Sequence, residues 1–409
     1  MANFRKKLDN TVRNVARYLL NGYKNSQTFF YLKQLNKKHT DDEKIRVGFI
    51  AQMPEIWDKE EPVFEQMRRN QLFQVSLIVV PAYDMINKKV GTDYEGNYFI
   101  KNYESNVIKA YNNGRWIDIT NKFDYLFYQR PYDHYLPAVL QSAVTVKHAK
   151  CCYIPYGFSG SNVFDAGNTN KSFFRNMYFS FLESDHMVEL LKAQFPYTVK
   201  LHHIENLGYP ALAPYYCINP TNKVSTILWT PRWSFDIRIG GSTFIENRDL
   251  LFELRKEGIG EKLVFRPHPL LLGELISKKI MTEEEVDKYL YDMNNNGIIY
   301  DKGRPIYNAF IDADVLITDY SSVIIQYFLT GRPIIYCESG IELNDEFNML
   351  KEGFYTAHNK AEVMLFIETL KRGEDPLAEK RREIKEKRLR NHSRSAELIV
   401  DRILIDARG

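Results

Sequence analysis

Apolar and polar residues alternate along the chain in two series of short runs, which predict two parallel β-sheets. After residue 44, four apolar runs that each lead into a loop predict strands: "IRVGFIAQ", "QVSLIVVPAY", "FDYLFYQRP" and "KCCYIPYGF". A second series begins after "LHHIENLGYPAL" and contains "TILWTPRW", "KLVFRPHP", "GIIYD", "DVLITDYSS" and "RPIIYCES". Continuous apolar strands separated by helical stretches are typical of parallel sheets that are covered on both faces. The pattern therefore predicts an α/β protein in which two Rossmann-like domains face a central cleft.

The length of 409 residues agrees with two domains flanked by shorter helical segments. We expect a basic amphipathic helical segment over residues 1–43 and a first Rossmann-like domain over 44–215. A second Rossmann-like domain is expected over 216–375, and a C-terminal helix over 376–409. "EEPVFEQMRRN" predicts a proline-started helix between the first two strands.

The N-terminal segment combines a helical apolar pattern with positive charge. Apolar residues recur at helical spacing from Phe4 to Leu20, and nine Lys or Arg precede Asp41, against one acidic residue, Asp9. Asn21-Gly22 predicts the end of this helix. A basic amphipathic helix can lie on an anionic membrane surface or pack against the body of the protein. The pattern leaves both possibilities open.

The C-terminal stretch is also helical and basic. Ile399, Ile403 and Leu404 can dock it onto the protein. Its charge run is typical of a solvated helix face rather than of a binding site.

Composition and charge exclude several classes of protein. The formal net charge is only +3, and no nucleic-acid-binding motif is present. The four cysteines have no CxxC spacing, which indicates reduced thiols rather than a disulfide framework or a zinc site. No signal peptide and no run of about 18 apolar residues is present, so we expect a chain that neither leaves nor crosses the membrane.

The segment "LITDYSSVIIQYFL" brings three polar residues to the point where an apolar strand passes into an apolar helix. These residues are Asp319, Ser321 and Ser322. Backbone N–H groups and hydroxyls at the positive end of a helix favour an anion such as phosphate. Asp and Ser are also favoured N-caps, so helix capping is the alternative, but capping needs only one of the three.

Two further strand ends carry cations and a hydroxyl. "FRPHP" places Arg266 and His268 after one strand, and "WTPRW" places Thr230 and Arg232 after another. An arginine can bind phosphate through two N–H groups, and a histidine can donate a hydrogen bond when neutral or balance negative charge when protonated. Each motif alone could be a turn or a surface ion pair. Together they predict a phosphate site, because ligands bind at the carboxyl ends of parallel strands.

The same stretches resemble the motif series of the CDP-glycerol glycerophosphotransferase family, which includes the teichoic acid polymerases and primases. "LGYP", "TPRW", "RPHP" and "DADVLITDYSSVIIQYFLTGRPIIYC" match it in order and spacing, over about residues 150–355. The resemblance implies a GT-B-like fold and transfer of a polyol phosphate, glycerol phosphate or ribitol phosphate, from a CDP-activated donor to a hydroxyl of a surface polymer. CMP would be released. The first domain would bind the acceptor, and the second would bind the nucleotide donor.

The resemblance also implies roles for single residues. His268 would bind the donor pyrophosphate and help CMP to leave. The cytidine would lie near Lys302–Ile306. The expected nucleotide- and phosphate-binding residues are Thr230, Arg232, Arg266, Asp319, Ser321, Ser322 and Arg304.

One position departs from the family pattern. The family usually has a Trp-His-Gly segment whose histidine is regarded as the acceptor base, whereas this chain has Tyr156 in "YIPYGF". A tyrosine with an ordinary pKa near 10 is a poor base at neutral pH. Asp133 and His134 in "QRPYDHYLP" are the catalytic candidates in its place, followed by Glu55 and Asp58. Each of these can also be a solvated loop residue.

Three other interpretations stay open. A GT-B glycosyltransferase that uses a UDP- or CMP-sugar fits the same fold, and Glu338 or Glu342 could then bind the donor ribose or sugar. A sugar-nucleotide epimerase and a non-enzymatic scaffold that has lost its base are the others. A His268→Ala variant separates an enzyme from a scaffold, because only the enzyme depends on this side chain.

We therefore expect an enzyme that requires no cofactor and no metal, because no acidic cluster or DxD motif stands at a suitable strand end. Its partners would be the CDP-activated polyol and a polyprenol-linked or glycan acceptor, without nucleic acid. We expect the protein in the cytoplasm, peripheral at the inner face of the membrane through its N-terminal helix. The sequence predicts neither the polyol, nor the acceptor, nor the oligomeric state.

Overall fold

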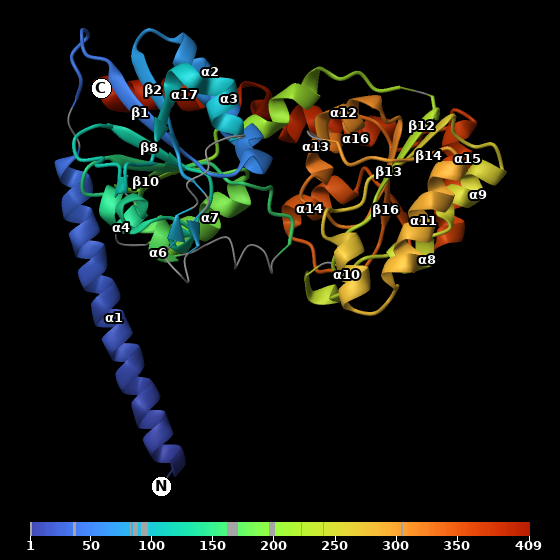
Figure 1. The fold of residues 1–409 in the computed structure, drawn as a ribbon, viewed down its shortest axis with the longest axis horizontal. Coiled ribbons are helices and arrows are strands. Elements are labelled where there is room, and N and C mark those ends of the chain that lie inside the picture. The colour runs from blue at the N-terminus through green and yellow to red at the C-terminus, as the bar shows by residue number, and fades with distance from the viewer. Residues whose placement is uncertain are drawn as a thin grey trace. The chain divides into compact units, whose positions relative to one another are not determined.

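The computed structural model describes residues 2–35, 38–81, 83–84, 89–90, 97–161, 171–195, 201–221, 223–239, 241–303 and 306–409. Its chain forms two compact units (Figure 1). Unit 1 consists of Met1–Tyr156, Thr169–Pro210 and Ser395–Gly409, and unit 2 of Gly157–Asn168 and Ala211–Arg394. The change of unit after Pro210 lies close to the boundary expected between residues 215 and 216. The last helix, however, belongs to the first unit.

Unit 1 is built on a seven-stranded parallel sheet with the order β11-β10-β9-β8-β1-β2-β5. The four predicted strands of the first series form β1, β2, β8 and β9. Strands β8, β9 and β10 are buried at every position, which explains their continuous apolar pattern. The sheet strands are β1 Ile45–Ala51, β2 Phe73–Val79, β5 Val107–Lys109, β8 Tyr125–Tyr128, β9 Lys150–Tyr153, β10 Met177–Phe181 and β11 His203–Glu205.

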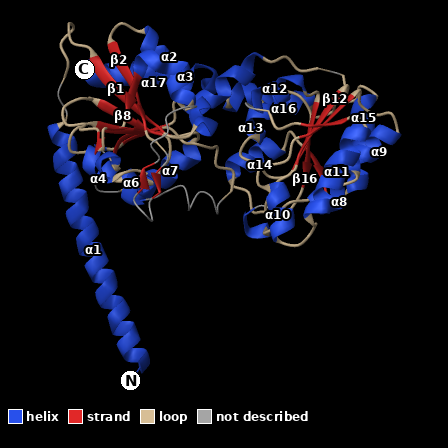
Figure 2. Cartoon of the chain, in the orientation of Figure 1, coloured by secondary structure: helices blue, strands red, loops and turns tan. Residues whose placement is uncertain are grey.

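Helices pack beside this sheet in unit 1 (Figure 2). The predicted proline-started helix is α2, which buries Val63, Phe64 and Met67. Two short antiparallel ribbons, β3 Tyr83–Asp84 with β4 Lys89–Val90 and β6 Tyr111–Asn112 with β7 Arg115–Trp116, stand apart from the sheet. The helices are α1 Ala2–Gln34, α2 Glu61–Arg69, α3 Tyr98–Tyr103, α4 Ser142–Thr145, α6 Lys171–Phe174, α7 Asp185–Gln194 and α17 Ser395–Arg408, with short 3-10 turns at Pro54–Lys59, Glu104–Asn106, Asp133–Tyr135 and Ala138–Leu140.

Unit 2 is built on a six-stranded parallel sheet with the order β14-β13-β12-β15-β16-β17. All five predicted strands of the second series are present, and the sequence pattern missed only the edge strand β17. Trp229 of β12 stacks on Phe244 at 5.7 Å between ring centroids, within the core on one face of the sheet. The strands are β12 Thr226–Thr230, β13 Lys262–Phe265, β14 Ile298–Tyr300, β15 Val315–Thr318, β16 Ile334–Cys337 and β17 Tyr355–Ala357.

The helices of unit 2 lie along both faces of its sheet (Figures 1 and 2). They are α8 Phe244–Asn247, α9 Leu250–Lys256, α10 Leu271–Ser277, α11 Glu283–Asn295, α12 Ile306–Asp312, α13 Ile324–Phe328, α14 Asp345–Lys351, α15 Lys360–Lys371 and α16 Ala378–Arg388, with 3-10 turns at Pro210–Cys217, Ile237–Ile239 and Arg390–Arg394. Two parallel sheets with this organisation confirm the expected α/β fold class.

The predicted stop of the N-terminal helix at Asn21-Gly22 is wrong, because α1 runs without a break from Ala2 to Gln34. The Asn21 and Asn25 side chains accept hydrogen bonds from Arg175, at 2.9 and 2.6 Å. Asn21 therefore stays on the helix surface and makes a tertiary contact instead of turning the chain. A glycine costs only about 1 kcal/mol inside a helix, so this contact can outweigh Gly22.

Of the two expectations for α1, packing against the body of the protein and contact with a membrane surface, the structure shows the first for part of the helix. Thr28 and Leu32 are buried against the rest of unit 1, and the Thr28 hydroxyl lies 3.2 Å from Asn176 Oδ1. Large apolar side chains on other faces are exposed, including Leu19, Tyr23 and Phe30. None of the helices that the structure describes has the length and apolar character needed to span a bilayer.

The C-terminal region forms two helices in place of the single one expected over residues 376–409. Helix α16 belongs to unit 2, whereas α17 belongs to unit 1, where it packs against α2. Ile399 and Ile403 of α17 are fully buried, as the pattern predicted.

Candidate functional site

The strand order of the second sheet reverses between β12 and β15. The chain continues from β12 to β13 and β14 on one side, and later from β15 to β16 and β17 on the other. In open parallel sheets, ligands bind at the carboxyl ends of the two strands where the order reverses, because the following loops diverge there. Thr230 ends β12 and is paired with Thr318, which ends β15. The predicted residues Arg232 and Asp319 follow directly.

Asp319 holds the two diverging loops together. Its carboxylate is fully buried and accepts hydrogen bonds from the Arg232 backbone N–H at 2.9 Å, from the Ser242 hydroxyl at 3.5 Å and from the Thr243 hydroxyl. Burial raises the pKa of Asp319 to about 6, and the hydrogen bonds from Thr243 and Arg232 oppose the rise. Asp319 therefore positions the loops around the site, and its oxygens are already engaged within unit 2.

Arg232 places a fixed positive charge at the switch point. Its guanidinium donates to the backbone carbonyls of Tyr320, at 3.0 Å, and Ile239, and it lies 5.2 Å from the centre of the Tyr320 ring. Burial lowers the pKa of Arg232 from its ordinary value. That ordinary value is so high that the guanidinium still stays charged at neutral pH. A held, half-buried guanidinium is suited to balance the charge of a phosphate.

The hydrogen bonds of His268 define its tautomer. The Leu270 backbone N–H donates to Nδ1 at 3.2 Å, so Nδ1 carries no proton and the neutral ring has its proton on Nε2. Burial, together with the charge of Arg232, lowers the pKa of His268 to about 4. The histidine therefore stands at the end of β13 as a neutral side chain with one N–H to donate.

Hydroxyl groups complete this part of unit 2. Thr230 Oγ1 is buried without a hydrogen-bond partner among the described residues. Ser321 Oγ accepts a long hydrogen bond of 3.4 Å from the Val323 backbone N–H, and Ser322 is exposed. The loops after β12 and β15 thus bring three hydroxyls to the switch point, beside Arg232.

Arg266 is placed differently from the expectation that it binds phosphate through two N–H groups. Its two terminal nitrogens donate to Asp301 Oδ2 at 2.6 Å and to the Gly303 carbonyl at 2.7 Å. Arg266 therefore holds the loop after β14, beside which the cytidine was expected. Arg304, also predicted as a nucleotide ligand, lies outside the described residues.

Several residues near the switch point were not indicated by the sequence pattern. Ser242 and Thr243 bind Asp319, and the segment from Gly157 to Ser161 belongs to unit 2, where the Gly160 N–H donates to the Tyr320 hydroxyl at 3.3 Å. A Cβ on Gly160 would come within 2.4 Å of the Phe347 ring. The two glycines of "YGFSG" were the available signal for this close packing.

The candidate bases lie in unit 1 and differ in availability. Asp133 accepts hydrogen bonds from the Ser142 backbone N–H at 2.7 Å and from its hydroxyl at 2.6 Å, so it anchors the first turn of α4. Burial raises the pKa of Asp133 in spite of these bonds. His134 is exposed, next to the Tyr135 ring at 4.2 Å between centroids.

Tyr156 is unsuited to the role of the family histidine. Burial and a 3.1 Å hydrogen bond with the Tyr132 hydroxyl raise the pKa of Tyr156 further above its ordinary value. Of the two further candidates, Glu55 is exposed and Asp58 forms an ion pair with Lys59. Within the described part of the chain, no three His, Cys, Asp or Glu side chains gather in a way that could hold a metal ion.

Comparisons with known proteins identify the family of the chain and structures with a similar fold. Residues 141–404 match the family described as CDP-Glycerol:Poly(glycerophosphate) glycerophosphotransferase. Among solved structures, the wall teichoic acid polymerase TagF, in a variant soaked with CDPG, aligns with a TM-score of 0.54 at 15% identity, over 97% of this chain and 96% of that chain. No match was found among curated proteins.

Two sugar-nucleotide epimerases have a similar fold. The UDP-GlcNAc 2-epimerase from Neisseria meningitidis, bound to UDP-GlcNAc, aligns with a TM-score of 0.56 at 11% identity, over 88% of this chain and 100% of that chain. The UDP-GlcNAc 2-epimerase from Methanocaldococcus jannaschii aligns with a TM-score of 0.52 at 14% identity, over 88% of this chain and 99% of that chain. At such identities these likenesses concern the GT-B-like fold alone.

Proposed function

This chain belongs to the CDP-glycerol:poly(glycerophosphate) glycerophosphotransferase family, and on that premise we propose that the switch point of the second sheet binds the pyrophosphate of CDP-glycerol. One observation carries the proposal. Three adjacent strands, β13, β12 and β15, end in a neutral imidazole N–H, a fixed guanidinium and a set of hydroxyls. The family activity is transfer of glycerol phosphate to a polymer acceptor, and these groups match the charge and hydrogen-bonding needs of its donor.

The reaction is an in-line displacement at the β-phosphorus, which carries the glycerol. An oxygen of the acceptor hydroxyl forms a bond to this phosphorus, while the bond from phosphorus to the bridging oxygen breaks and CMP leaves with the electron pair. Such transfers are accelerated mainly by positioning and by stabilising the charge on the phosphoryl oxygens. Arg232 would supply the positive charge, and His268 Nε2–H would donate to the pyrophosphate as negative charge builds on the leaving group.

The proton of the acceptor hydroxyl needs a base, and we assign this role to His134 rather than to Asp133. Both carboxylate oxygens of Asp133 are occupied by Ser142, whereas His134 is exposed. Loss of transfer with retained donor binding in His134→Ala supports the assignment, and unchanged kcat contradicts it.

No metal and no cofactor take part in this proposal: Arg232 would supply a positive charge to the pyrophosphate, and the neutral donors would supply hydrogen bonds to its oxygens. Activity that is unaffected by a chelator supports this part, and activity restored only by a divalent cation contradicts it. Glycerol is assigned as the polyol from the family description, with ribitol as the alternative.

We further propose that the protein works in the cytoplasm, at the inner face of the membrane, on a polyprenol-linked or glycan acceptor. Helix α1 supports this proposal, because its sequence is basic and Leu19, Leu20 and Tyr23 are exposed on it. The expected result is co-sedimentation with anionic phospholipid vesicles that weakens with salt. Equal partition onto neutral vesicles would argue against a charge-directed contact.

The donor assignment is tested by thermal unfolding with CDP-glycerol, CDP-ribitol, CMP, UDP-glucose and UDP-N-acetylglucosamine in parallel. A ligand at a hundredfold its Kd adds about 2.7 kcal/mol to the free energy of unfolding. We expect stabilisation by the cytidine ligands that is lost in Ser322→Ala and His268→Ala. Ser277→Ala, which alters an exposed serine on α10, should retain it.

The same measurement also tests the alternative function, in which the donor is a UDP-sugar. Stabilisation by UDP-sugars alone would contradict the glycerophosphate donor and favour a GT-B glycosyltransferase or an epimerase. Stabilisation by CDP-glycerol that is unaffected by both site variants would place the donor elsewhere.

A further inference from the structure

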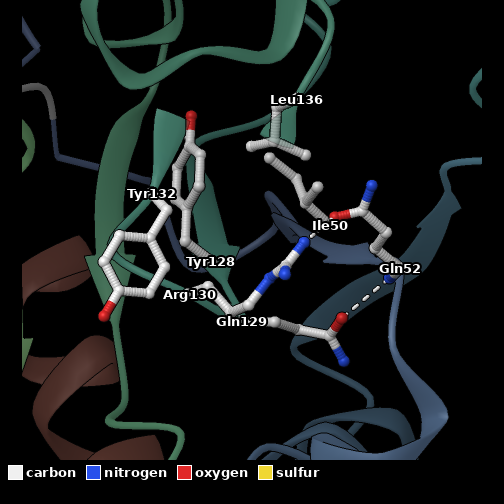
Figure 3. Close-up of a pocket in the computed structure, with 7 residues that line it drawn as sticks. All are labelled: Ile50, Gln52, Tyr128, Gln129, Arg130, Tyr132 and Leu136. Carbon is white, nitrogen blue, oxygen red and sulfur yellow. Dashed lines mark hydrogen bonds between the residues drawn. The ribbon is translucent and has the colours of Figure 1, made fainter. Parts of the chain in front are cut away.

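The first sheet has a switch point of its own, between β1 and β8. The chain passes from β1 to β2 and β5 on one side, and then from β8 to β9, β10 and β11 on the other. A small hollow lies at the carboxyl ends of β1 and β8, lined by Ile50, Gln52, Tyr128, Gln129, Arg130, Tyr132 and Leu136 (Figure 3). By the rule that located the first site, this is where unit 1 is expected to bind a ligand.

Hydrogen bonds hold the two loops of this switch point in place. The buried Gln129 side chain accepts from the backbone N–H groups of Gln52 and Met53, at 2.7 and 2.8 Å, and donates to the Met53 carbonyl at 3.1 Å. The Gln52 side chain in turn donates to the Tyr135 carbonyl at 3.0 Å and accepts from Arg130 (Figure 3). The loops are therefore organised without a ligand, which lowers the cost of binding one.

Tyr132 of this hollow is grouped with three other aromatic rings, and we name the four the aromatic platform: Tyr132, His134, Tyr135 and Tyr156. Tyr132 lies about 6 Å between centroids from each of the other three rings, at 5.9, 6.1 and 6.0 Å. His134 and Tyr135 are 4.2 Å apart. The Arg130 guanidinium lies 4.5 Å from the centre of the Tyr135 ring, so a cation–π contact supports the ring.

Part of the platform is open to solvent. Tyr135 is 44% exposed and His134 is also exposed, although large aromatic side chains are usually covered. The hollow beneath has a volume of about 10 Å³, which is room for about one water molecule. A larger ligand must therefore lie on the rings rather than enter the hollow.

We propose that the aromatic platform binds a pyranose ring of the acceptor, so that the acceptor is a glycan. A pyranoside has an apolar C–H face that matches an aromatic ring face, which carries partial negative charge, and hydroxyls that match the Tyr132 and Tyr156 hydroxyls. A bare glycerol phosphate chain has no ring face and needs uncommitted cations, whereas Arg130 is engaged with Tyr135 and Gln52.

This inference rests on the proposed function, which requires an acceptor, and it names the chemical class of that acceptor. Residues 130–135 precede the segment 141–404 in which the chain matches its family, so the family match itself gives these residues no role. A sugar stacked on Tyr135 would also bring its hydroxyls next to His134, the proposed base.

Saturation-transfer NMR on the full chain tests the proposal with methyl β-D-glucopyranoside, methyl β-D-galactopyranoside and methyl N-acetyl-β-D-glucosaminide as probes. We expect at least one pyranoside to bind, with the strongest transfer to its ring C–H protons. Removal of the ring in Tyr135→Ala should weaken that binding about fivefold to tenfold, whereas Tyr135→Phe, which keeps the ring, should stay within about twofold. Tyr291→Ala, an exposed tyrosine of unit 2, is the matched control and should bind as the wild type does.

Three outcomes would overturn the proposal: binding of no pyranoside, binding that is indifferent to Tyr135→Ala, or glycerol 3-phosphate binding in their place with a dependence on Arg130. Titration of the same samples with CDP-glycerol keeps the two claims apart. Failure of the wild type to bind CDP-glycerol contradicts the donor site, whereas pyranoside binding that ignores Tyr135 contradicts the platform alone.

Discussion

At the scale of single residues, the hydrogen bond from the Leu270 N–H to Nδ1 limits what His268 can do. The sequence left open whether this histidine acts as a neutral donor or as a protonated cation. With the proton on Nε2 and a pKa of about 4, the free enzyme holds it neutral across the physiological range. In the proposed reaction its part is then to donate a hydrogen bond to the pyrophosphate, not to deliver a proton to CMP.

The pH dependence of kcat/KM for CDP-glycerol tests whether the neutral form of His268 is the active one. The contribution of His268 should be constant from about pH 8 to pH 5 and should fall as pH approaches 4, because kcat/KM reports groups of the free enzyme. A requirement for the protonated ring would instead give a contribution that rises as pH falls towards 4. The lowered pKa also means that stability from this site is complete above about pH 6.5 and is lost as pH decreases towards 4.

Variants of His268 distinguish the loss of its hydrogen bond from the loss of its side-chain volume. His268→Ala should lower kcat/KM by about 10²–10³-fold, as loss of one donor to a developing charge commonly does. His268→Gln keeps an N–H donor at a similar reach and should recover part of the loss. An equal loss of kcat/KM in both variants would show that the imidazole does more than donate a hydrogen bond.

The sequence indicated which residues stand at the strand ends, but not which partners they bind. Arg266 and Asp133 stand at strand ends, as ligands do, yet they bind Gly303 and Ser142 of their own units. A side chain can bind a ligand or support a loop, and only three-dimensional distances distinguish the two. The bond that fixes the His268 tautomer was likewise invisible in the sequence.

At the scale of elements, the last helix is attached to unit 1 by a buried polar cluster. Asp406 of α17 accepts hydrogen bonds from the Tyr125 and Tyr178 hydroxyls, each at 2.6 Å, and pairs with Lys150 at 2.5 Å. Burial alone would raise the pKa of Asp406, but these partners lower it below its ordinary value. Stability from this carboxylate is therefore present above about pH 4 and is lost as pH falls further.

Asp406→Asn should lower the free energy of unfolding by about 3–5 kcal/mol, because it leaves Lys150 buried without its counter-charge. Urea unfolding at neutral pH measures the effect. The control is Asp401→Asn on the same helix, where the side chain is exposed and little change is expected. A loss below about 1 kcal/mol in Asp406→Asn would show that the pair contributes little.

Elements were predictable where the apolar pattern was continuous and local. The nine predicted strands follow such runs, and α2 begins as its proline suggested. The pattern missed β10, although its five residues are all buried, because no turn signal set Met177–Phe181 apart. It also ended α1 at Asn21-Gly22, where contacts with Arg175 continue the helix.

At the scale of the whole molecule, one topology occurs twice, and the two proposed sites lie where it reverses. Each parallel sheet starts at a central strand, extends to one side and then returns to extend to the other. In unit 2 the reversal carries Arg232 and the serine hydroxyls, and in unit 1 it carries Arg130 and the aromatic platform. The sequence predicted strand ends as the site, but strand order, and hence the switch points, came only from the structure.

The proposed donor site depends above all on neutral His268, which would donate its Nε2–H to CDP-glycerol at the second switch point. The most direct test is long-range ¹H–¹⁵N NMR of ¹⁵N-histidine-labelled protein at pH 7, with the His268 signal assigned by His268→Gln. We predict the neutral Nε2–H tautomer in the free protein and a shift of its Nε2 resonance on addition of CDP-glycerol but not of UDP-N-acetylglucosamine. A protonated ring, an Nδ1–H tautomer or a resonance indifferent to CDP-glycerol would contradict the account.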